Sequence, residues 1–316
     1  MVNSKIAITI GDPAGIGPEI TLKALSVFPT QEIKFTIVGD RAVINEIIKM
    51  QGVDYLLENI QIIETDIIKS SNFPKNCPST EGGLASSSYI SKAVELALTG
   101  RVDALVTAPI SKEALKMAGI RWHGHTEMLA ELSNTSEYAM MLCGGPLRVI
   151  LVTIHEAFKN VPSLITKEKI LKTIILAEKA SLMLNIEKPK IAVCALNPHA
   201  GEAGLFGVEE QDQIIPAIES AREKSIQVYG PYPADTIFYR AYKGEFDIIV
   251  CMYHDQGLIP LKMIAFESGV NVTVGIPFIR TSPDHGTAYD IAWKGIANPS
   301  SMIEAIKMAI NLKVIR

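Results

Sequence analysis

Short runs rich in valine and isoleucine recur along this chain, and longer stretches with helical spacing separate them. Strands that alternate with helices in this way are typical of an α/β protein with a largely parallel sheet. The runs that predict strands are IAITI, FTIVG, DALVTA, RVILVTI, KIAVCAL, DIIVCMY and VNVTVG. The stretches that predict helices are EITLKAL, AVINEIIKM, residues 82–98, KEKILKTIILAEKA, EEQDQIIPAIESA and SMIEAIKMAI. Thr166 and the segment Asn298-Pro299-Ser300 stand where helix N-caps are expected.

The composition narrows the class of protein. With 316 residues, 48% of them hydrophobic, the chain has enough apolar material for one large domain or two ordinary ones. The net charge of -4, with acids and bases interspersed, argues against nucleic acid as a partner. No apolar run approaches the roughly 20 residues that cross a bilayer, and no leader precedes KIAITI, so we expect a soluble cytoplasmic protein. The widely spaced cysteines argue against a disulfide framework or a CxxC metal site; they are Cys77, Cys143, Cys194 and Cys251.

Polar or turn-forming residues follow five of the predicted strands. Because the carboxyl ends of parallel strands meet at one edge of a sheet, and open α/β folds bind ligands there, we expect the functional groups at this edge. The segments that follow these strands are Gly11-Asp12-Pro13, Ala108-Pro109, His155, Asn197-Pro198-His199 and His254-Asp255.

Three histidines, His155, His199 and His254, each end a strand-like run. A single histidine in such a place is usually a hydrogen-bonded structural residue. Neutral imidazoles are also good ligands for zinc and similar divalent ions, and three of them at matching positions favour a metal site. A fourth histidine segment, GHTE at 124–127, also follows an apolar run that looks like a strand, but the residues themselves favour a helix start at His125-Thr126-Glu127 with Thr126 as the cap.

The glycine-rich segment 11–19 leads from the first predicted strand into a helix. Its backbone amides could bind an anion, or the segment could be a tight strand-to-helix turn, and it matches neither GxGxxG nor the Walker pattern. Two cations, Lys262 and Arg280, could reach the same edge and bind phosphate or carboxylate. The alternative is solvated surface charge, and for Lys262 an aliphatic stem that lies along apolar neighbours.

Seven motifs together resemble the 4-hydroxythreonine-4-phosphate dehydrogenase (PdxA) family of vitamin B6 biosynthesis, in order and over nearly the whole chain. The segment HGTAYDIAWKGIANP also resembles the nucleotide-binding stretch of isocitrate and isopropylmalate dehydrogenases. The motifs are TIGDPAGIGPE at the start, VTAPISK at 106–112, GHTE at 124–127, NPHAGEAGLFGVEE at 197–210, GPYPADTIF at 230–238, YHDQGLIPLK at 253–262 and IRTSPDHGTAYDIA at 279–292.

The resemblance implies a two-domain subunit with the isocitrate/isopropylmalate dehydrogenase-like fold. The first α/β domain would comprise residues 1–128 and 276–316. The second would comprise residues 129–275 and carry the interface of a homodimer. The active site would lie in the cleft between the domains, close to the subunit interface.

The resemblance also implies the residues of the site. The metal ligands would be His155, His199 and His254, contributed across two subunits. The substrate would be held by His125, Thr126, Lys262, Asn271 and Arg280. The dinucleotide, NAD or NADP, would face Asp284, His285, Gly286, Thr287, Ala288, Asp290 and Asn298. Candidate catalytic residues are His199, Lys262 and Asp255, and Asp255 either orients His254 or accepts a proton.

The activity implied is the NAD(P)-dependent oxidation of 4-phosphooxy-L-threonine to 2-amino-3-oxo-4-phosphooxybutanoate, which loses carbon dioxide to give 3-amino-2-oxopropyl phosphate. One divalent ion per site, zinc, cobalt, magnesium or manganese, would assist it. One alternative is a related dehydrogenase acting on D-threonate or D-erythronate 4-phosphate. An alternative from another class is a phosphotransacetylase-like acyl transferase.

Two features depart from the family pattern. Trp293 stands where the related pattern usually has a small glycine, which would alter packing around the cofactor stretch. The segment EAFKNVPSLIT after His155 replaces a leucine-rich continuation. Because that segment adjoins a predicted metal ligand, the shape of the substrate is the assignment these differences affect most.

Overall fold

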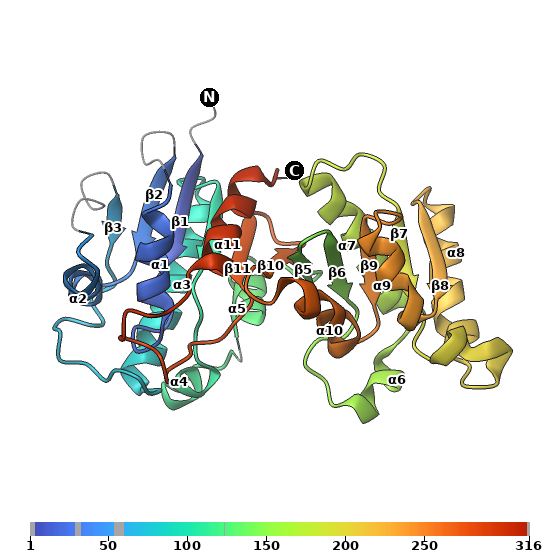
Figure 1. Cartoon of the computed structure of the whole chain (residues 1–316), viewed down its shortest axis with the longest axis horizontal. Helices are drawn as coiled ribbons and strands as arrows, with labels where there is room; N and C mark the ends of the chain where they lie inside the picture. The colour runs from blue at the N-terminus through green and yellow to red at the C-terminus, as the bar shows by residue number, and fades with distance from the viewer. Residues whose placement is uncertain (1–3, 29–32, 54–59, 123, 315–316) are drawn as a thin grey trace. The chain divides into compact units, whose positions relative to one another are not determined.

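Two units make up the chain in the computed structural model, which describes residues 4–28, 33–53, 60–122 and 124–314 (Figure 1). Unit 1 comprises Met1–Ser136 and Ile276–Asn311, and unit 2 comprises Glu137–Gly275 and Leu312–Arg316. Residues 129–136 therefore group with unit 1 and residues 312–316 with unit 2, whereas the boundaries expected from the sequence place them the other way round.

Unit 1 contains a parallel sheet in the order β3-β2-β1-β4-β11. Its strands are β1 (Lys5–Thr9), β2 (Lys34–Val38), β3 (Gln61–Ile63), β4 (Ala104–Thr107) and β11 (Ile279–Pro283). Its helices are α1 (Gly17–Leu25), α2 (Arg41–Gln51), α3 (Thr80–Leu98), α4 (Lys112–Met117), α5 (His125–Leu132) and α11 (Ser300–Asn311). Helix α11 packs on β4 and β11 beside α1, whereas α3 packs on β1, β2 and β4 beside α4 and α5. Helices cover the strands, so β1 reads as an almost uninterrupted apolar run.

Unit 2 contains a mixed sheet in the order β10-β5-β6-β9-β7-β8. Its strands are β5 (Ala139–Gly144), β6 (Leu147–Leu151), β7 (Ile191–Cys194), β8 (Val228–Tyr232), β9 (Ile248–Cys251) and β10 (Val270–Val274). The pairs β10–β5 and β5–β6 are antiparallel, and the remaining pairs are parallel. Its α-helices are α6 (Val161–Leu164), α7 (Lys167–Met183), α8 (Ile215–Glu223), α9 (Ala234–Tyr242) and α10 (His254–Ala265), with shorter helical turns η2 (Phe158–Asn160), η3 (Pro198–Gly204) and η4 (Glu210–Ile214).

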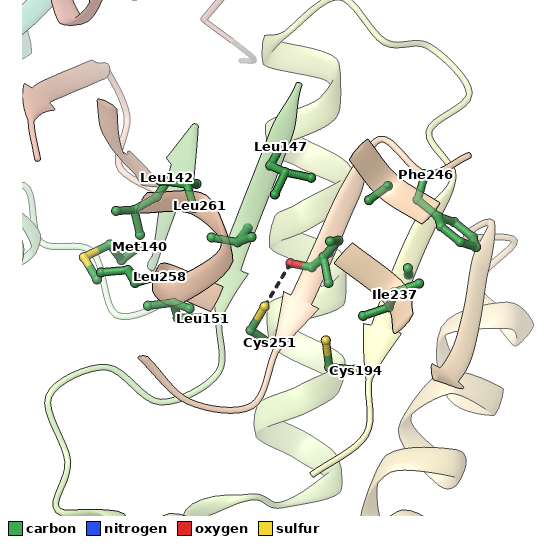
Figure 2. Close-up of a cluster of buried hydrophobic side chains, with 14 residues drawn as sticks. Met140, Leu142, Leu147, Leu151, Cys194, Ile237, Phe246, Cys251, Leu258 and Leu261 are labelled. Carbon is green, nitrogen blue, oxygen red and sulfur yellow. Dashed lines mark hydrogen bonds between the residues drawn. The ribbon is translucent and has the colours of Figure 1, made fainter. Parts of the chain in front are cut away.

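The core of unit 2 lies between its strands and helices α9 and α10. Figure 2 shows Leu258 and Leu261 of α10 turned toward the strand residues Leu142 and Leu151. The thiols of Cys194 and Cys251 lie in the same cluster on the neighbouring strands β7 and β9, and both are buried (Figure 2). Burial is the reason these cysteines behave as small apolar side chains.

The predicted α/β class and largely parallel pairing are confirmed, as are the seven predicted strands and six predicted helices. The Thr166 side chain caps α7 by accepting from the Lys169 amide at 3.3 Å, and Asn298 accepts from the Ser300 amide at 2.9 Å. The segment EEQDQIIPAIESA is helical, but it begins with the wider π-helical turn η4. Within the described residues, no helix has both the length and the apolar character needed to cross a membrane.

Four strands are absent from the prediction: β3, β5, β8 and β11. Strand β3 has only three residues, too short a run to identify a strand, and β8 contains Gly230 and Pro231, which are rare inside strands. The sequence of β5, AMMLCG, lacks valine and isoleucine. Strand β11, IRTSP, is polar and nevertheless wholly buried, which is the opposite of the pattern that identifies a core strand.

Candidate active site

The glycine-rich segment after β1 is a closed turn. The amides of Asp12 and Ile16 donate to the carbonyl oxygens of Pro109 and Thr287, both at 2.9 Å. The Asp12 carboxylate accepts from the Ala14 amide at 2.9 Å, and the Asp12 carbonyl accepts from the Gly15 amide at 3.1 Å. These four amides are already hydrogen-bonded within the chain, so the tight-turn interpretation holds and the anion-binding alternative is wrong for them.

This turn also fastens the loop 284–298, in which the sequence predicts the cofactor-binding residues. The Tyr289 hydroxyl donates to the buried Asp12 carboxylate at 2.6 Å. The Ala297 amide donates to the buried carboxylate of Glu19 at 2.8 Å. A Cβ at Gly15 would lie 2.9 Å from the Cβ and the carbonyl oxygen of Thr287, so the loop rests directly on the glycine. The loop has no regular structure of its own, and these contacts determine its path.

Trp293 adds a further anchor to the loop. Its indole N–H donates to the carbonyl oxygen of Pro13 at 3.1 Å. Its ring meets that of Phe73 edge-on at 5.5 Å between centroids, and the ammonium of Lys75 lies 4.2 Å from the ring centroid. The backbone of Trp293 has φ 60°, a left-handed conformation that glycine adopts most easily. Trp293, which stands where the related pattern usually has glycine, is expected to alter packing around this loop. In the structure its ring packs against Phe73 and so attaches the loop to that residue.

Several predicted cofactor-binding residues remain accessible on this fastened loop. His285, Gly286 and Asp290 are exposed, while Thr287 and Ala288 are half-buried. The Asp284 amide donates to the Ser301 hydroxyl at 3.1 Å, and the side-chain oxygen of Asn298 accepts from the amide and the hydroxyl of Ser300. A loop with a fixed backbone and exposed polar groups fits a dinucleotide. These assignments stay predictions.

Arg280, which is buried, and His125, which is half-buried, are polar neighbours in unit 1. Arg280, on β11, is 1% exposed, and its Nε and Nη2 donate to the Thr107 hydroxyl on β4 at 3.1 and 2.7 Å. Burial lowers the pKa of the Arg280 guanidinium to about 9. The charge is therefore costly to hold in the folded chain, and an anion bound beside it would offset that cost.

The ring of His125 is held neutral beside this guanidinium. Burial lowers the pKa of His125 well below its ordinary value, and the charge of Arg280 lowers it further. The ring bonds the backbone of Ala108, while its Nε2 atom is buried without a hydrogen-bond partner. A buried, unpartnered ring nitrogen is unusual in a fold, and in the neutral ring it suits a ligand hydroxyl that can donate to it.

Two expectations for this segment are wrong. The cap of α5 is Gly124, and no side chain caps the helix, so Thr126 lies inside the first turn instead of capping it. The segment GHTE also does not follow a strand, because α4 precedes it. Glycine at the cap position explains both the early helix start and the placement of His125 as its first residue.

The neutral state of His125 predicts that stability decreases in acid. As the pH falls below the unfolded pKa near 6.5, the unfolded chain binds a proton that folded His125 does not bind until its much lower pKa is reached. The free energy of unfolding is expected to decrease over that window by up to about 1.4 kcal/mol per pH unit. Urea unfolding at about pH 7 and about pH 5.5 tests this, with His125→Gln expected to lose that share of the decrease. His285→Gln, which changes an exposed histidine of unit 1, is the control, and an equal change in both variants would contradict the assignment.

In unit 2, His155 and His254 lie together. Their ring centroids are 5.4 Å apart with a tilt of 41°. Nδ1 of His254 lies 2.7 Å from the Asp255 carboxylate. Because a carboxylate accepts, this contact in a neutral ring favours the tautomer with the proton on Nδ1 and a lone pair on Nε2, the form that binds a metal ion. This donor arrangement fits a divalent metal.

His199 lies in the turn after β7, and its side chain is exposed. Among the described residues of a single chain, no group of three histidine, cysteine, aspartate or glutamate side chains is arranged to hold a metal ion. The structure thus brings two of the three predicted ligands together within the chain. The expectation that the three ligands are contributed across two subunits stays a prediction.

The other two predicted substrate residues, Lys262 and Asn271, also belong to unit 2. Lys262 lies on α10, half-buried, with its ammonium 5.5 Å from the centroid of the Phe266 ring. Asn271 lies on β10 opposite Leu142 of β5. The ammonium of Lys262 thus makes a cation–π contact, and its role toward a substrate stays a prediction.

Four polar residues of these sites have no role in the sequence-based prediction. Thr107 holds Arg280, Asp12 holds Tyr289, and Glu210 accepts from the amides of Leu196 and Asn197 near His199. All belong to the motifs VTAPISK, TIGDPAGIGPE, IRTSPDHGTAYDIA and NPHAGEAGLFGVEE. Their presence in long motifs was the available signal, but only the fold shows which partner each one has.

Comparisons with known proteins agree along the whole chain. The family model described as "Pyridoxal phosphate biosynthetic protein PdxA" matches residues 18–309. A relative from Sulfurihydrogenibium sp. named 4-hydroxythreonine-4-phosphate dehydrogenase is 48% identical, covering 99% of each chain. A D-threonate 4-phosphate dehydrogenase from Salmonella typhimurium is 41% identical, covering 99% of this chain and 100% of the relative. The crystal structure of 4-hydroxythreonine-4-phosphate dehydrogenase from Klebsiella pneumoniae is 39% identical, with a TM-score of 0.87 over 97% of this chain and 98% of that one.

Proposed function

We propose, since the chain belongs to the family of the pyridoxal phosphate biosynthetic protein PdxA, that it oxidises 4-phosphooxy-L-threonine with a nicotinamide dinucleotide and a divalent metal ion. Membership makes the chain an oxidoreductase, because its relatives at 46 to 48% identity are named as dehydrogenases. The acyl-transferase alternative is thereby overturned. The observation that best supports the substrate is the unpartnered Nε2 of His125 beside the buried guanidinium of Arg280.

The proposed reaction balances with one dinucleotide. The C3 hydroxyl loses its proton, and the hydrogen on C3 leaves as hydride to the nicotinamide ring, giving a ketone that is β to the carboxylate. Loss of carbon dioxide, with a proton taken up on carbon, gives 3-amino-2-oxopropyl phosphate. The net reaction consumes the oxidised dinucleotide and releases its reduced form and carbon dioxide.

Within unit 1, Arg280 would bind an anionic group of the substrate. Its guanidinium is already oriented by the two hydrogen bonds to Thr107, so little freedom is lost when the anion binds. The ring of His125, neutral because of burial, would accept a hydrogen bond at Nε2. Thr126 from the same helix, with Lys262 and Asn271 of unit 2, complete the proposed substrate contacts.

The metal would be held by His155 and His254 of one subunit and by His199 of its partner. A divalent ion there would supply Lewis acidity toward the C3 oxygen and toward the enolate formed on decarboxylation. Asp255 would orient His254 through the hydrogen bond at Nδ1, so we assign it orientation and not proton transfer. Zinc, cobalt, magnesium and manganese all remain candidates.

A homodimer is the assembly that would complete this site. Helix α10, which begins at His254, exposes four large apolar side chains along its length or at its C-cap: Ile259, Met263, Ile264 and Phe266, with Met263 82% exposed. Apolar side chains grouped on one helix are typical of a surface that another subunit covers. We therefore propose that α10 contributes to the subunit interface beside the metal ligands.

The function is tested by following the reduced dinucleotide by its absorbance with each candidate substrate. We expect turnover with 4-phosphooxy-L-threonine, loss of turnover with a chelator, and recovery when a divalent ion is added back. Parallel assays with NAD and NADP give the cofactor preference.

The rival substrate is D-threonate or D-erythronate 4-phosphate, since the Salmonella relative carries a name of that kind. Turnover of these sugar acids without turnover of 4-phosphooxy-L-threonine would replace the proposed substrate with the rival. Absence of dinucleotide reduction with all three compounds would contradict the proposal as a whole.

A further inference from the structure

His199 lies in a backbone turn of unusual hand. Five consecutive residues, His199–Ala203, have positive φ values of 51, 55, 79, 43 and 55°, and Gly204 follows at 97°. Four of the five carry a side chain, whose Cβ crowds the following carbonyl oxygen in this conformation. Left-handed residues normally occur singly, so a run of this length needs contacts from outside the turn to persist.

The carboxylate of Glu210 supplies such contacts. Glu210 is 2% exposed, and its Oε1 accepts from the amides of Leu196 and Asn197, each at 2.8 Å. Its Oε2 accepts from the side-chain amide of Asn197 at 3.0 Å, and Glu209 accepts from the same amide at 2.7 Å. The two acids thus hold the backbone and side chain of Asn197, two residues before His199.

The turn also wraps closely around this carboxylate. A Cβ at Gly201 would lie 2.6 Å from Oε2 of Glu210, so no larger residue fits there without displacing the acid. A Cβ at Gly207 would lie 2.4 Å from the side-chain nitrogen of Asn197 and 2.6 Å from Oε2 of Glu209. Both glycines have positive φ. The backbone of the left-handed turn therefore lies close against the Glu210 carboxylate, with no room for a larger side chain between them.

The helix that carries Glu210 is itself distorted at this point. Residues Glu210–Ile214 form a π-helical turn, in which the Ile215 amide donates to the carbonyl oxygen of Glu210. Pro216 follows in the first turn of α8 and has no amide to donate, which favours a break in the regular pattern there. Single π-turns occur frequently beside functional sites.

We propose that Glu210 is a positioning residue: through Asn197 it holds the left-handed turn and so sets the direction in which His199 presents its imidazole to a divalent metal ion. The proposal rests on the proposed function for the assignment of His199 as a ligand. The imidazole is exposed and lies 6.2 Å from the Phe206 ring between centroids, so the turn and not core packing orients it. Glu210 itself does not touch the metal or the substrate.

The test uses Glu210→Gln, which keeps the size of the side chain but replaces one accepting oxygen with an NH₂ group that faces amide donors. Zinc binding to the full-length protein is measured by calorimetry without substrate, and amide hydrogen exchange of residues 196–207 is measured without metal. We expect zinc affinity to fall about 10- to 100-fold and exchange of this segment to accelerate. Glu202→Gln makes the same chemical change at an exposed position of the turn, and it is expected to alter neither measurement.

A second variant protects the test against a fold defect in the first. Gly201→Ala leaves the carboxylate in place but presses on Oε2, so it is expected to weaken zinc binding and accelerate exchange in the same segment. Wild-type zinc affinity with unchanged exchange in Glu210→Gln would overturn the positioning role. If the wild-type protein itself binds no zinc, cobalt or manganese, the metal assignment of the proposed function fails, and the role of Glu210 fails with it.

Discussion

An equimolar mixture of the His199→Ala and His254→Ala proteins is expected to regain about a quarter of the wild-type turnover after subunit exchange, by the symmetry of the proposed dimer. Each proposed site takes His254 from one subunit and His199 from the other. In a mixed dimer one site therefore carries both substitutions and the other carries neither. Random pairing makes about half of the dimers mixed, each with one intact site out of two.

Each variant alone is expected to lose about a thousandfold in turnover, which corresponds to about 4 kcal/mol of transition-state stabilisation supplied through the metal. Neither change is expected to unfold the protein, because His199 is exposed and the His254 side chain is 32% exposed. Turnover is followed by absorbance of the reduced dinucleotide after the two proteins are unfolded together and refolded. The circular dichroism spectrum of each variant checks that it folds.

The matched control is a mixture of the His155→Ala and His254→Ala proteins. These two residues lie together in one chain, with ring centroids 5.4 Å apart, so each site of a mixed dimer would carry one of the two substitutions. No recovery is expected. Recovery in this control, or none in the first mixture despite exchange of subunits, would contradict a metal site shared between subunits.

The second large effect is expected from Arg280→Met, which should lower kcat/KM for the phosphorylated substrate by about a hundredfold or more. The guanidinium is buried, prealigned by Thr107, and its pKa is lowered to about 9 because water is excluded from it. A bound anion in such a place makes charge-assisted hydrogen bonds that water does not screen. The loss is expected mainly as a higher KM for the substrate, with the KM for the dinucleotide little changed.

Initial-rate kinetics with both substrates varied, together with urea unfolding, separates this role from a structural one. Arg41→Met, at an exposed arginine of unit 1 that pairs with Glu64, is the control and is expected to leave both KM values unchanged. Thr107→Val keeps the Arg280 charge but removes the acceptor that orients it, so a smaller rise in substrate KM is expected. A lower free energy of unfolding with an unchanged substrate KM would show that Arg280 serves the fold alone.

The sequence predicts those parts of the fold whose residues face an apolar core. Strands β1, β6 and β9 read as valine- and isoleucine-rich runs because helices cover them. Strand β11 is not predicted from the sequence, because its buried side chains include the polar residues Arg280 and Thr281. Arg280 donates to Thr107 of β4, and Thr281 donates to the Ala305 carbonyl of α11. Burial of polar groups against distant partners leaves no periodic apolar signal.

In the candidate site too, contacts between neighbours in the sequence can be predicted, whereas contacts between distant segments cannot. The contact of His254 with Asp255 joins neighbours in the sequence, so their pairing could be anticipated. The hand of the turn at His199 could not, because four of its five residues are not glycine and the carboxylate that steadies it lies eleven residues further on. The closed turn at Asp12 depends on Pro109 and Thr287, which come from two other segments of unit 1.

The division of unit 1 between two stretches of chain has a consequence during synthesis on the ribosome. Unit 2 lies almost wholly within Glu137–Gly275, so all six of its strands emerge while unit 1 still lacks β11 and α11. Until then β4 has an open edge and lacks α11, one of the helices that cover it, and an open edge is the kind of surface that pairs with other nascent chains. Unit 1 is thus the part of the molecule whose folding is completed last, and the open edge of β4 needs protection until β11 has been synthesised.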